Sequence, residues 1–336
     1  MAKKKEVVDL VNNYYETANQ DNKDIVEEYL ENATHLTEQS LKQYRSAAKV
    51  WLAYINRYLN NKHISEIKPL DFQKYQNWLY NQGIYEANIK MKRSLVSNIN
   101  EYLILYYGDE ERYKSFRNFV TKAIKVPVTG KKYKKEPLTD EEYKNLCVYL
   151  EEHEEWQKLA YLKFTYISGC RKNESASLLK EVVNYKPIEK MIKVRDEDGK
   201  EHVVPMKKYK TNLIKCKGKK SDEPRRLSFD EDTMYYLKKW LEVRGEDDCP
   251  YMFITGKGEK AHKPDIKIFN RWCNYFEEFI GRRLHPHLLR SSRASSLALH
   301  GKNIEAIQNL LGHKSSETTR IYIVKEDNDE EDELFV

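Results

Sequence analysis

The feature that most constrains this chain is a set of basic and phenolic side chains at fixed separations near its C-terminus. His287 and Arg290 are three residues apart, so a helix would place them on one face. His313 follows within the phrase Leu-Gly-His, and Tyr322 comes nine residues after it. A guanidinium, two imidazoles and a phenol brought together can bind a phosphodiester and attack it with a side chain in place of water. The fold must therefore gather these residues into one site.

A second arginine precedes this region in the phrase Ser168-Gly169-Cys170-Arg171-Lys172-Asn173-Glu174. Together with Pro286-His287-Leu288-Leu289-Arg290, Leu311-Gly312-His313 and Tyr322, it resembles the signature of the tyrosine recombinases, the lambda-integrase, Xer and Cre group. The four elements occur in the family's order and at its separations. The resemblance covers residues 138–324 in detail and the preceding hundred residues by pattern.

The resemblance implies a role for each residue of the signature. Tyr322 would be the nucleophile that forms a 3′-phosphotyrosine, and Arg171 and Arg290 would bind the scissile phosphate. His287 would exchange a proton near the phenol, and His313 would donate to a nonbridging oxygen. Imidazole titrates in the range that such proton transfers need.

The family also uses a lysine from a β-turn to protonate the leaving 5′ oxygen. Lys217 matches best, because Lys-Gly is followed by basic residues and a predicted strand. The interval from Arg171 is long for the family, and the neighbouring lysines remain alternatives (Lys215, Lys219 and Lys220). The residues after Arg290 also depart from the family pattern, and Ser291 and Arg293 are candidates for phosphate contacts.

The pattern of apolar residues predicts a mainly α protein with a small antiparallel β-sheet in the catalytic domain. Apolar residues recur at helical spacing from Leu41 to Tyr58, Pro69 opens a second helix, and two more are expected over 88–107 and 110–125. Helices are also expected over 156–167, 231–243, 265–279, 287–300, 304–311 and 316–324. Short β-like runs are expected at 191–194, 202–206, 212–217 and 225–229, with Asp198-Gly199 as a turn.

These elements predict a two-domain organisation. We expect an N-terminal extension (1–35), a helical core DNA-binding domain (36–124), a linker (125–137), a catalytic domain (138–324) and an acidic C-terminal tail (325–336). The linker contains two prolines, a glycine and several lysines. By resemblance, the two domains would form a clamp around DNA.

Composition limits the partners and the compartment. The net charge is +6, and it would be +13 without the seven acids of the C-terminal tail, which suits a polyanionic partner. Five scattered cysteines without a C-x-x-C pair predict neither a disulfide framework nor a zinc site, and no cofactor or metal is expected. The sequence has neither an 18-residue apolar run nor a signal-peptide pattern, so we expect a cytoplasmic, nucleoid-associated protein of a prokaryotic host.

The resemblance implies a site-specific DNA recombinase, an integrase of a mobile element. It would act as a homo-tetramer on double-stranded DNA recombination sites, with accessory DNA-bending proteins as further partners. Two alternatives stay open: DNA relaxation like that of a type IB topoisomerase, and a DNA-binding protein that has lost catalysis. Metal-dependent transposition is a further class, which would require Mg²⁺.

Overall fold

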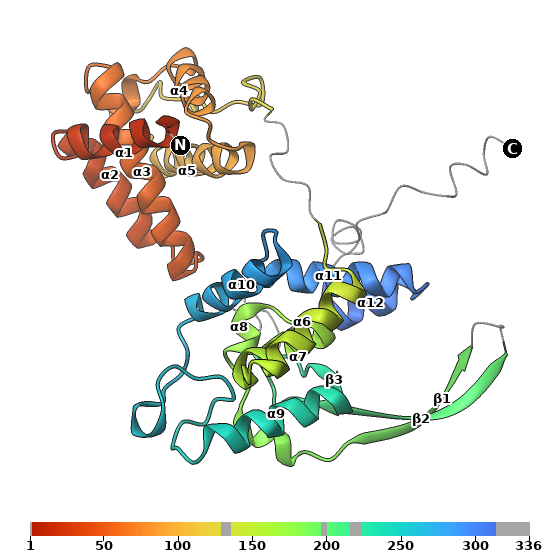
Figure 1. Cartoon of the computed structure of the whole chain (residues 1–336). Coiled ribbons are helices and arrows are strands. Elements are labelled where there is room, and N and C mark those ends of the chain that lie inside the picture. The colour runs from red at the N-terminus through yellow and green to blue at the C-terminus, as the bar shows by residue number, and fades with distance from the viewer. Residues whose placement is uncertain (1, 129–135, 196–199, 216–223, 314–336) are drawn as a thin grey trace, which may run out of the picture. The chain divides into compact units, whose positions relative to one another are not determined.

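The computed structural model describes residues 2–128, 136–195, 200–215 and 224–313. The chain divides into two compact units, residues 1–133 and 134–336, each of which contains its own hydrophobic core. The described residues are mostly helical with one three-stranded antiparallel sheet, as the sequence predicts (Figure 1). None of the helices in these ranges combines the length and the apolar composition needed to cross a membrane.

The first unit is built from helices around a cluster of aromatic side chains. Trp51 is 1% exposed, and its ring centroid lies 4.6 Å from that of Tyr75 and 6.0 Å from that of Phe72. The two N-terminal helices contribute to the same core, because Leu10, Val26 and Leu30 pack into it. The elements are α1 (Ala2–Tyr14), α2 (Gln20–Asn32), α3 (Glu38–Tyr58), η1 (Ile64–Glu66), α4 (Pro69–Asn81) and α5 (Glu86–Tyr107).

The helix expected over residues 110–125 is wrong, because this stretch forms turns and extended chain. The Asn118 side chain accepts a hydrogen bond from the backbone of Val120, a local bond that competes with helix formation. Arg93 of α5 donates to the carbonyl of Ile124 at 2.9 Å. Phe116 and Phe119 still enter the core, so the apolar spacing marks buried residues without a helix.

The second unit is organised around α7 (Trp156–Ser168), whose residues are buried on nearly every side. It contacts α6 (Asp140–Glu152), α9 (Glu231–Arg244), α11 (Pro286–Leu299) and β3 (Ser228–Asp230). The other elements are α8 (Lys172–Ser175), η2 (Lys180–Asn184), η3 (Gly258–Lys260), α10 (Lys267–Ile280) and α12 (Ile304–Leu311).

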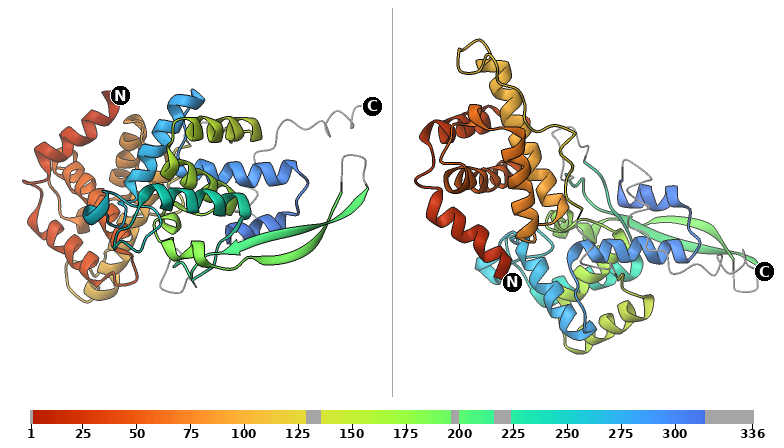
Figure 2. Two further views of the ribbon diagram at one scale, coloured as in Figure 1. Left: turned by 60° about the horizontal axis from the view of Figure 1, so that its bottom comes forward. Right: turned by 90° about the horizontal axis from the view of Figure 1, so that it is seen from above.

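The sheet has the strand order β1-β2-β3 and is antiparallel throughout. β1 (Ile188–Arg195) pairs with β2 (Glu201–Lys210) over its whole length, from Ile188 opposite Lys208 to Arg195 opposite Glu201. This ribbon extends away from the helices of its unit (Figure 2). The run expected at 225–229 and the described part of the run expected at 212–217, residues 212–215, form less strand than predicted: an isolated bridge joins Ile214 to Arg225, and β3 begins at Ser228.

We predict that replacing Trp51 by Ala destabilises the first unit by about 3–5 kcal/mol, because the change removes a fully buried indole from an aromatic cluster. Leu105→Ala, at an apolar residue of α5 that is 73% exposed, is the matched control and should change stability by less than about 0.5 kcal/mol. Urea unfolding followed by circular dichroism measures both. Equal effects of the two substitutions would contradict the assignment of Trp51 to the core.

Candidate active site

The turn that carries Arg171 depends on a glycine. α7 ends at Ser168, and Gly169 adopts the left-handed conformation with φ +60°, which favours glycine. A Cβ at this position would lie 2.5 Å from the Leu311 side chain, so Gly169 also allows the end of α12 to approach closely. Arg171 then forms the N-cap of α8, where Glu174 accepts its backbone N–H at 2.8 Å.

Helix α11 positions His287 and Arg290. Its start is fixed by Pro286 in the first turn and by His285, whose ring accepts the backbone N–H of Leu288 at 3.1 Å. His287 is exposed in this first turn, whereas Arg290, one turn later, is fully buried. The two residues lie one turn apart on the same helix, as expected, but they differ in burial. Arg290 is the buried one because it lies where α7 and α12 end.

Arg290 joins these two helix ends. Its Nη1 donates to the Gly169 carbonyl at 2.5 Å, and its Nη2 donates to the Leu311 carbonyl at 2.7 Å. Both oxygens lie at helix C-termini, where the negative end of the helix dipole stabilises a cation. A guanidinium has five N–H donors, and these two bonds to backbone carbonyls hold the residue in place.

His313 follows directly from the end of α12. Gly312 closes that helix in the left-handed conformation with φ +65°, and the His313 backbone N–H donates to the Gln308 carbonyl at 3.1 Å. The Gln308 side chain donates in turn to the His313 carbonyl at 3.0 Å. The His313 residue is 8% exposed, so its imidazole is held inside the unit.

The electrostatics show which predicted residues lie together. The pKa of His313 is lowered from its usual 6.5 to about 4, first by burial and then by the positive charges of Arg290 and Arg171, followed by those of Arg225 and His287. The fields of Arg171, Arg290 and His287 thus all reach the His313 imidazole. The structure therefore gathers four of the six predicted site residues in one region. The other two, Lys217 and Tyr322, lie outside the described residues.

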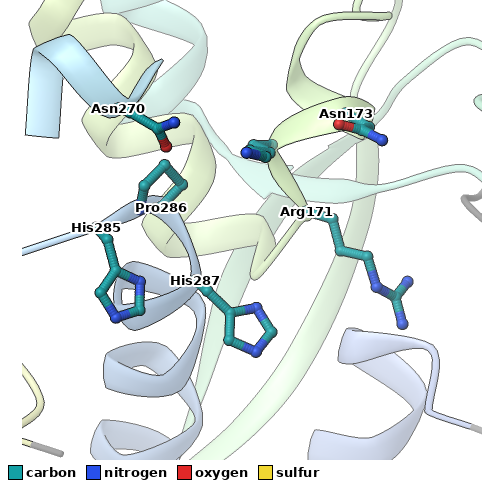
Figure 3. Close-up of a pocket in the computed structure, with 7 residues that line it drawn as sticks. Arg171, Asn173, Asn270, His285, Pro286 and His287 are labelled. Atoms are coloured by element: carbon teal, nitrogen blue, oxygen red, sulfur yellow. The ribbon is translucent and has the colours of Figure 1, made fainter. Parts of the chain in front are cut away.

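A pocket of about 260 Å³ opens beside these residues. Figure 3 shows Arg171, from the turn before α8, and His287, from α11, projecting toward the same side of it. The Arg171 side chain is 32% exposed, which leaves its guanidinium accessible to a ligand. Further lining residues are Lys172, Asn173, Asn270, His285 and Pro286.

Glu174 anchors the Arg171 turn from inside. Its side chain is fully buried and accepts from Arg171 Nη1 at 3.2 Å and from Arg225 Nη2 at 2.9 Å. Burial alone would raise the pKa of Glu174, but the hydrogen bond and charge of Arg225, together with the contacts of Arg171, lower it overall. The carboxylate is therefore ionised in a site that is otherwise positive.

Sequence reasoning took Arg225 only as the start of a strand. The position of Arg225 shortly after the basic stretch that holds Lys217 could have indicated a role in the site. Its contacts could not be predicted, because they join residues far apart in sequence. Ser291 and Arg293, the candidates for phosphate contacts, have partners within the protein: the buried Ser291 hydroxyl donates to the His287 carbonyl, and the Arg293 guanidinium lies over the Tyr166 ring. Among the described residues, no three His, Cys, Asp or Glu side chains are grouped to hold a metal ion.

Comparisons with known proteins agree with this geometry. The pattern of the phage integrase family matches residues 136–329, more than half of the chain, and that of the phage integrase N-terminal SAM-like domain matches residues 23–80. The chain is 28% identical over 331 residues to the SPbeta prophage-derived recombinase-like protein YomM of Bacillus subtilis, covering 96% of this chain and 93% of that protein. It is also 28% identical over 307 residues to the tyrosine recombinase XerC of Rickettsia bellii, covering 88% and 89%.

Solved structures share the fold. The XerH site-specific recombinase bound to its palindromic difH substrate aligns with a TM-score of 0.65 at 19% identity, covering 93% of this chain and 83% of that one. The Tn1549 transposon integrase in complex with transposon right end DNA aligns with a TM-score of 0.64 at 13% identity, covering 93% and 98%. At these identities the likeness concerns the fold alone.

We predict that His313 makes stability depend on pH below neutrality. Its pKa is about 4 when folded and 6.5 in its usual environment, so the unfolded chain takes up the proton first as the pH falls. The free energy of unfolding should therefore be highest above about pH 6.5 and decline toward pH 4. In His313→Gln the decline over this window should be smaller. Urea unfolding at intervals from pH 7 to 4 measures it, and parallel profiles for the two proteins would contradict the buried, neutral imidazole.

Proposed function

We propose that this chain, which belongs to the phage integrase family and is a tyrosine-type site-specific recombinase, cleaves and rejoins DNA strands through a 3′-phosphotyrosine intermediate. The observation that carries the proposal is the buried Arg290, which joins the ends of α7 and α12 and thereby sets Arg171 and His313 around one positively charged region. A phosphodiester in its transition state carries negative charge on its nonbridging oxygens, which such a region stabilises.

In this mechanism the Tyr322 hydroxyl attacks the scissile phosphorus. The new bond joins the phenol oxygen to the 3′-phosphate, and the bond to the 5′ oxygen breaks. The phenol proton passes to His287, and Lys217 gives a proton to the leaving 5′ oxygen, which departs as a 5′-hydroxyl. Attack by a second 5′-hydroxyl reverses these steps and reseals DNA, because the phosphotyrosine keeps the energy of the original bond.

Arg171, Arg290 and His313 act on the phosphate during this exchange. The guanidinium groups are permanently charged and provide paired donors that match phosphate oxygens. A histidine whose pKa is about 4 is neutral near pH 7, and it still carries one ring N–H that can donate to a nonbridging oxygen. The neutral form suits a donor that must remain close to two arginines without repelling them.

The partner in this proposal is a double-stranded DNA recombination site, and the biological role is integration or excision of a mobile element. The protein would assemble as a homo-tetramer on two duplexes, with accessory DNA-bending proteins, on the nucleoid. Residues 1–35 would form an N-terminal extension, residues 36–124 the core DNA-binding domain and residues 138–324 the catalytic domain, with 125–137 as the linker and 325–336 as the acidic tail. The recombinase and integrase structures with a similar fold are complexes with DNA, which supports a DNA partner.

We predict that Tyr322→Phe abolishes covalent attachment to DNA while DNA binding is kept, because only the attacking oxygen is lost. A labelled pool of nicked duplexes of randomised sequence, incubated with the protein in EDTA, would trap an adduct visible on a denaturing gel. Mobility-shift assays on the recovered duplexes measure binding. Tyr235→Phe, at a tyrosine that is 58% exposed, is the control and should form adduct as the wild type does.

The same experiment separates the alternatives. Sealing of DNA without exchange between two duplexes would indicate relaxation like that of a type IB topoisomerase. Binding without any adduct in the wild type would indicate a DNA-binding protein without catalysis. Cleavage that requires Mg²⁺ would contradict the proposed mechanism altogether.

A further inference from the structure

Arg225 contacts both of the turns that carry candidate active-site residues. Its Nη2 donates to the Glu174 carboxylate at 2.9 Å, next to the Arg171 turn. Its Nη1 donates to the Leu310 carbonyl at 3.1 Å, in the last turn of α12 ahead of His313. Arg225 and Arg290 thus contact the same pair of turns through different partners. Arg290 donates to the carbonyls of Gly169 and Leu311, whereas Arg225 donates to Glu174 and to the carbonyl of Leu310.

The fit around Arg225 is close. A Cβ on Gly312 would collide with Arg225 Nη1, so the glycine before His313 is needed for this approach as well as for its φ of +65°. The backbone of Arg225 is fixed by two hydrogen bonds of 2.9 Å with Ile214, a residue that is 1% exposed. The backbone that carries the guanidinium is thereby attached to the core of the unit.

Glu174 is shared between two cations, and the sharing is unequal. Arg225 forms the shorter ion pair, 2.9 Å against 3.2 Å, and its side chain is 18% exposed compared with 32% for Arg171. One carboxylate cannot neutralise two guanidinium groups, so the trio has a net charge of +1. The more exposed member, Arg171, is the one that lines the pocket.

We propose that Arg225 is a positioning residue for the recombination reaction: it acts as the main counterion of Glu174 and so leaves the charge of Arg171 to a DNA phosphate. This inference rests on the proposed function. Without Arg225, the buried Glu174 would have Arg171 as its remaining ion-pair partner. The Arg171–Glu174 pair would then be neutral as a whole, and Arg171 would be drawn toward the buried carboxylate and away from the pocket.

The test uses the duplex selected by the wild-type protein and measures the initial rate of adduct formation. Arg225→Gln should lower the rate by about ten- to a hundredfold, because the phosphate loses the attraction of an uncompensated charge. Arg225→Lys should recover part of the loss, since it restores the counterion. Arg226→Gln is the matched control: this neighbouring arginine donates to the Thr211 carbonyl at 2.9 Å and should change the rate less than about threefold.

The double variant Glu174→Gln/Arg225→Gln distinguishes a charge effect from a loss of structure. A neutral amide in place of the Glu174 carboxylate needs no counterion, so the double variant should be faster than Arg225→Gln alone. If Arg225 only supported the fold, adding Glu174→Gln would not restore the rate, and that result would overturn the inference. Circular dichroism of each variant checks that it is folded.

A readout without DNA separates the failure of this inference from the failure of the proposed function. The positive charge of Arg225 helps to lower the pKa of His313, so Arg225→Gln should raise that pKa when it is followed by NMR titration of the free protein. An unchanged His313 titration would contradict the placement of Arg225. A wild-type protein that forms no adduct on any duplex would instead overturn the proposed function, and the role of Arg225 in the reaction with it.

Discussion

The candidate site depends on the two hydrogen bonds by which Arg290 joins the Gly169 and Leu311 carbonyls. These groups lie 121 and 21 residues from Arg290 in the sequence, so the bonds fix long-range contacts. Burial of a charge is costly unless hydrogen bonds and opposite dipoles compensate for it. Two helix C-termini provide that compensation here, and they bring the turn before Arg171 next to the turn before His313. The rest of the site follows from this junction.

The region around Arg171, Arg225 and Arg290 is positively charged, and a buried carboxylate reduces the repulsion between its arginines. Glu174 is the acid of this group, and it lies between Arg171 and Arg225. Burial and then the same positive charges lower the pKa of His313 and keep its imidazole neutral, so a histidine can lie among arginines at little electrostatic cost. The glycines at 169 and 312 allow both turns to approach closely. Backbone geometry and charge distribution are therefore parts of one arrangement.

Much of the fold could be predicted from the sequence, because apolar periodicity and Pro69 mark helices that form where expected. The helix expected over 110–125 failed because bonds of Asn118 and Arg93 override the local pattern. Motif spacing identified residues that the structure brings together. Spacing predicts which face of a helix a residue lies on but not how deeply it is buried, so the burial of Arg290 was missed. The role of Arg225 was missed because its partners lie 51 and 85 residues away.

The most direct test of the central claim is to identify the side chain that becomes joined to DNA. The adduct formed in EDTA would be digested with nuclease and protease, and the modified peptide sequenced by mass spectrometry. The proposed mechanism predicts a nucleotide attached through its 3′-phosphate to Tyr322, with a free 5′-hydroxyl on the released strand. Attachment to another side chain, or through a 5′-phosphate, would contradict it.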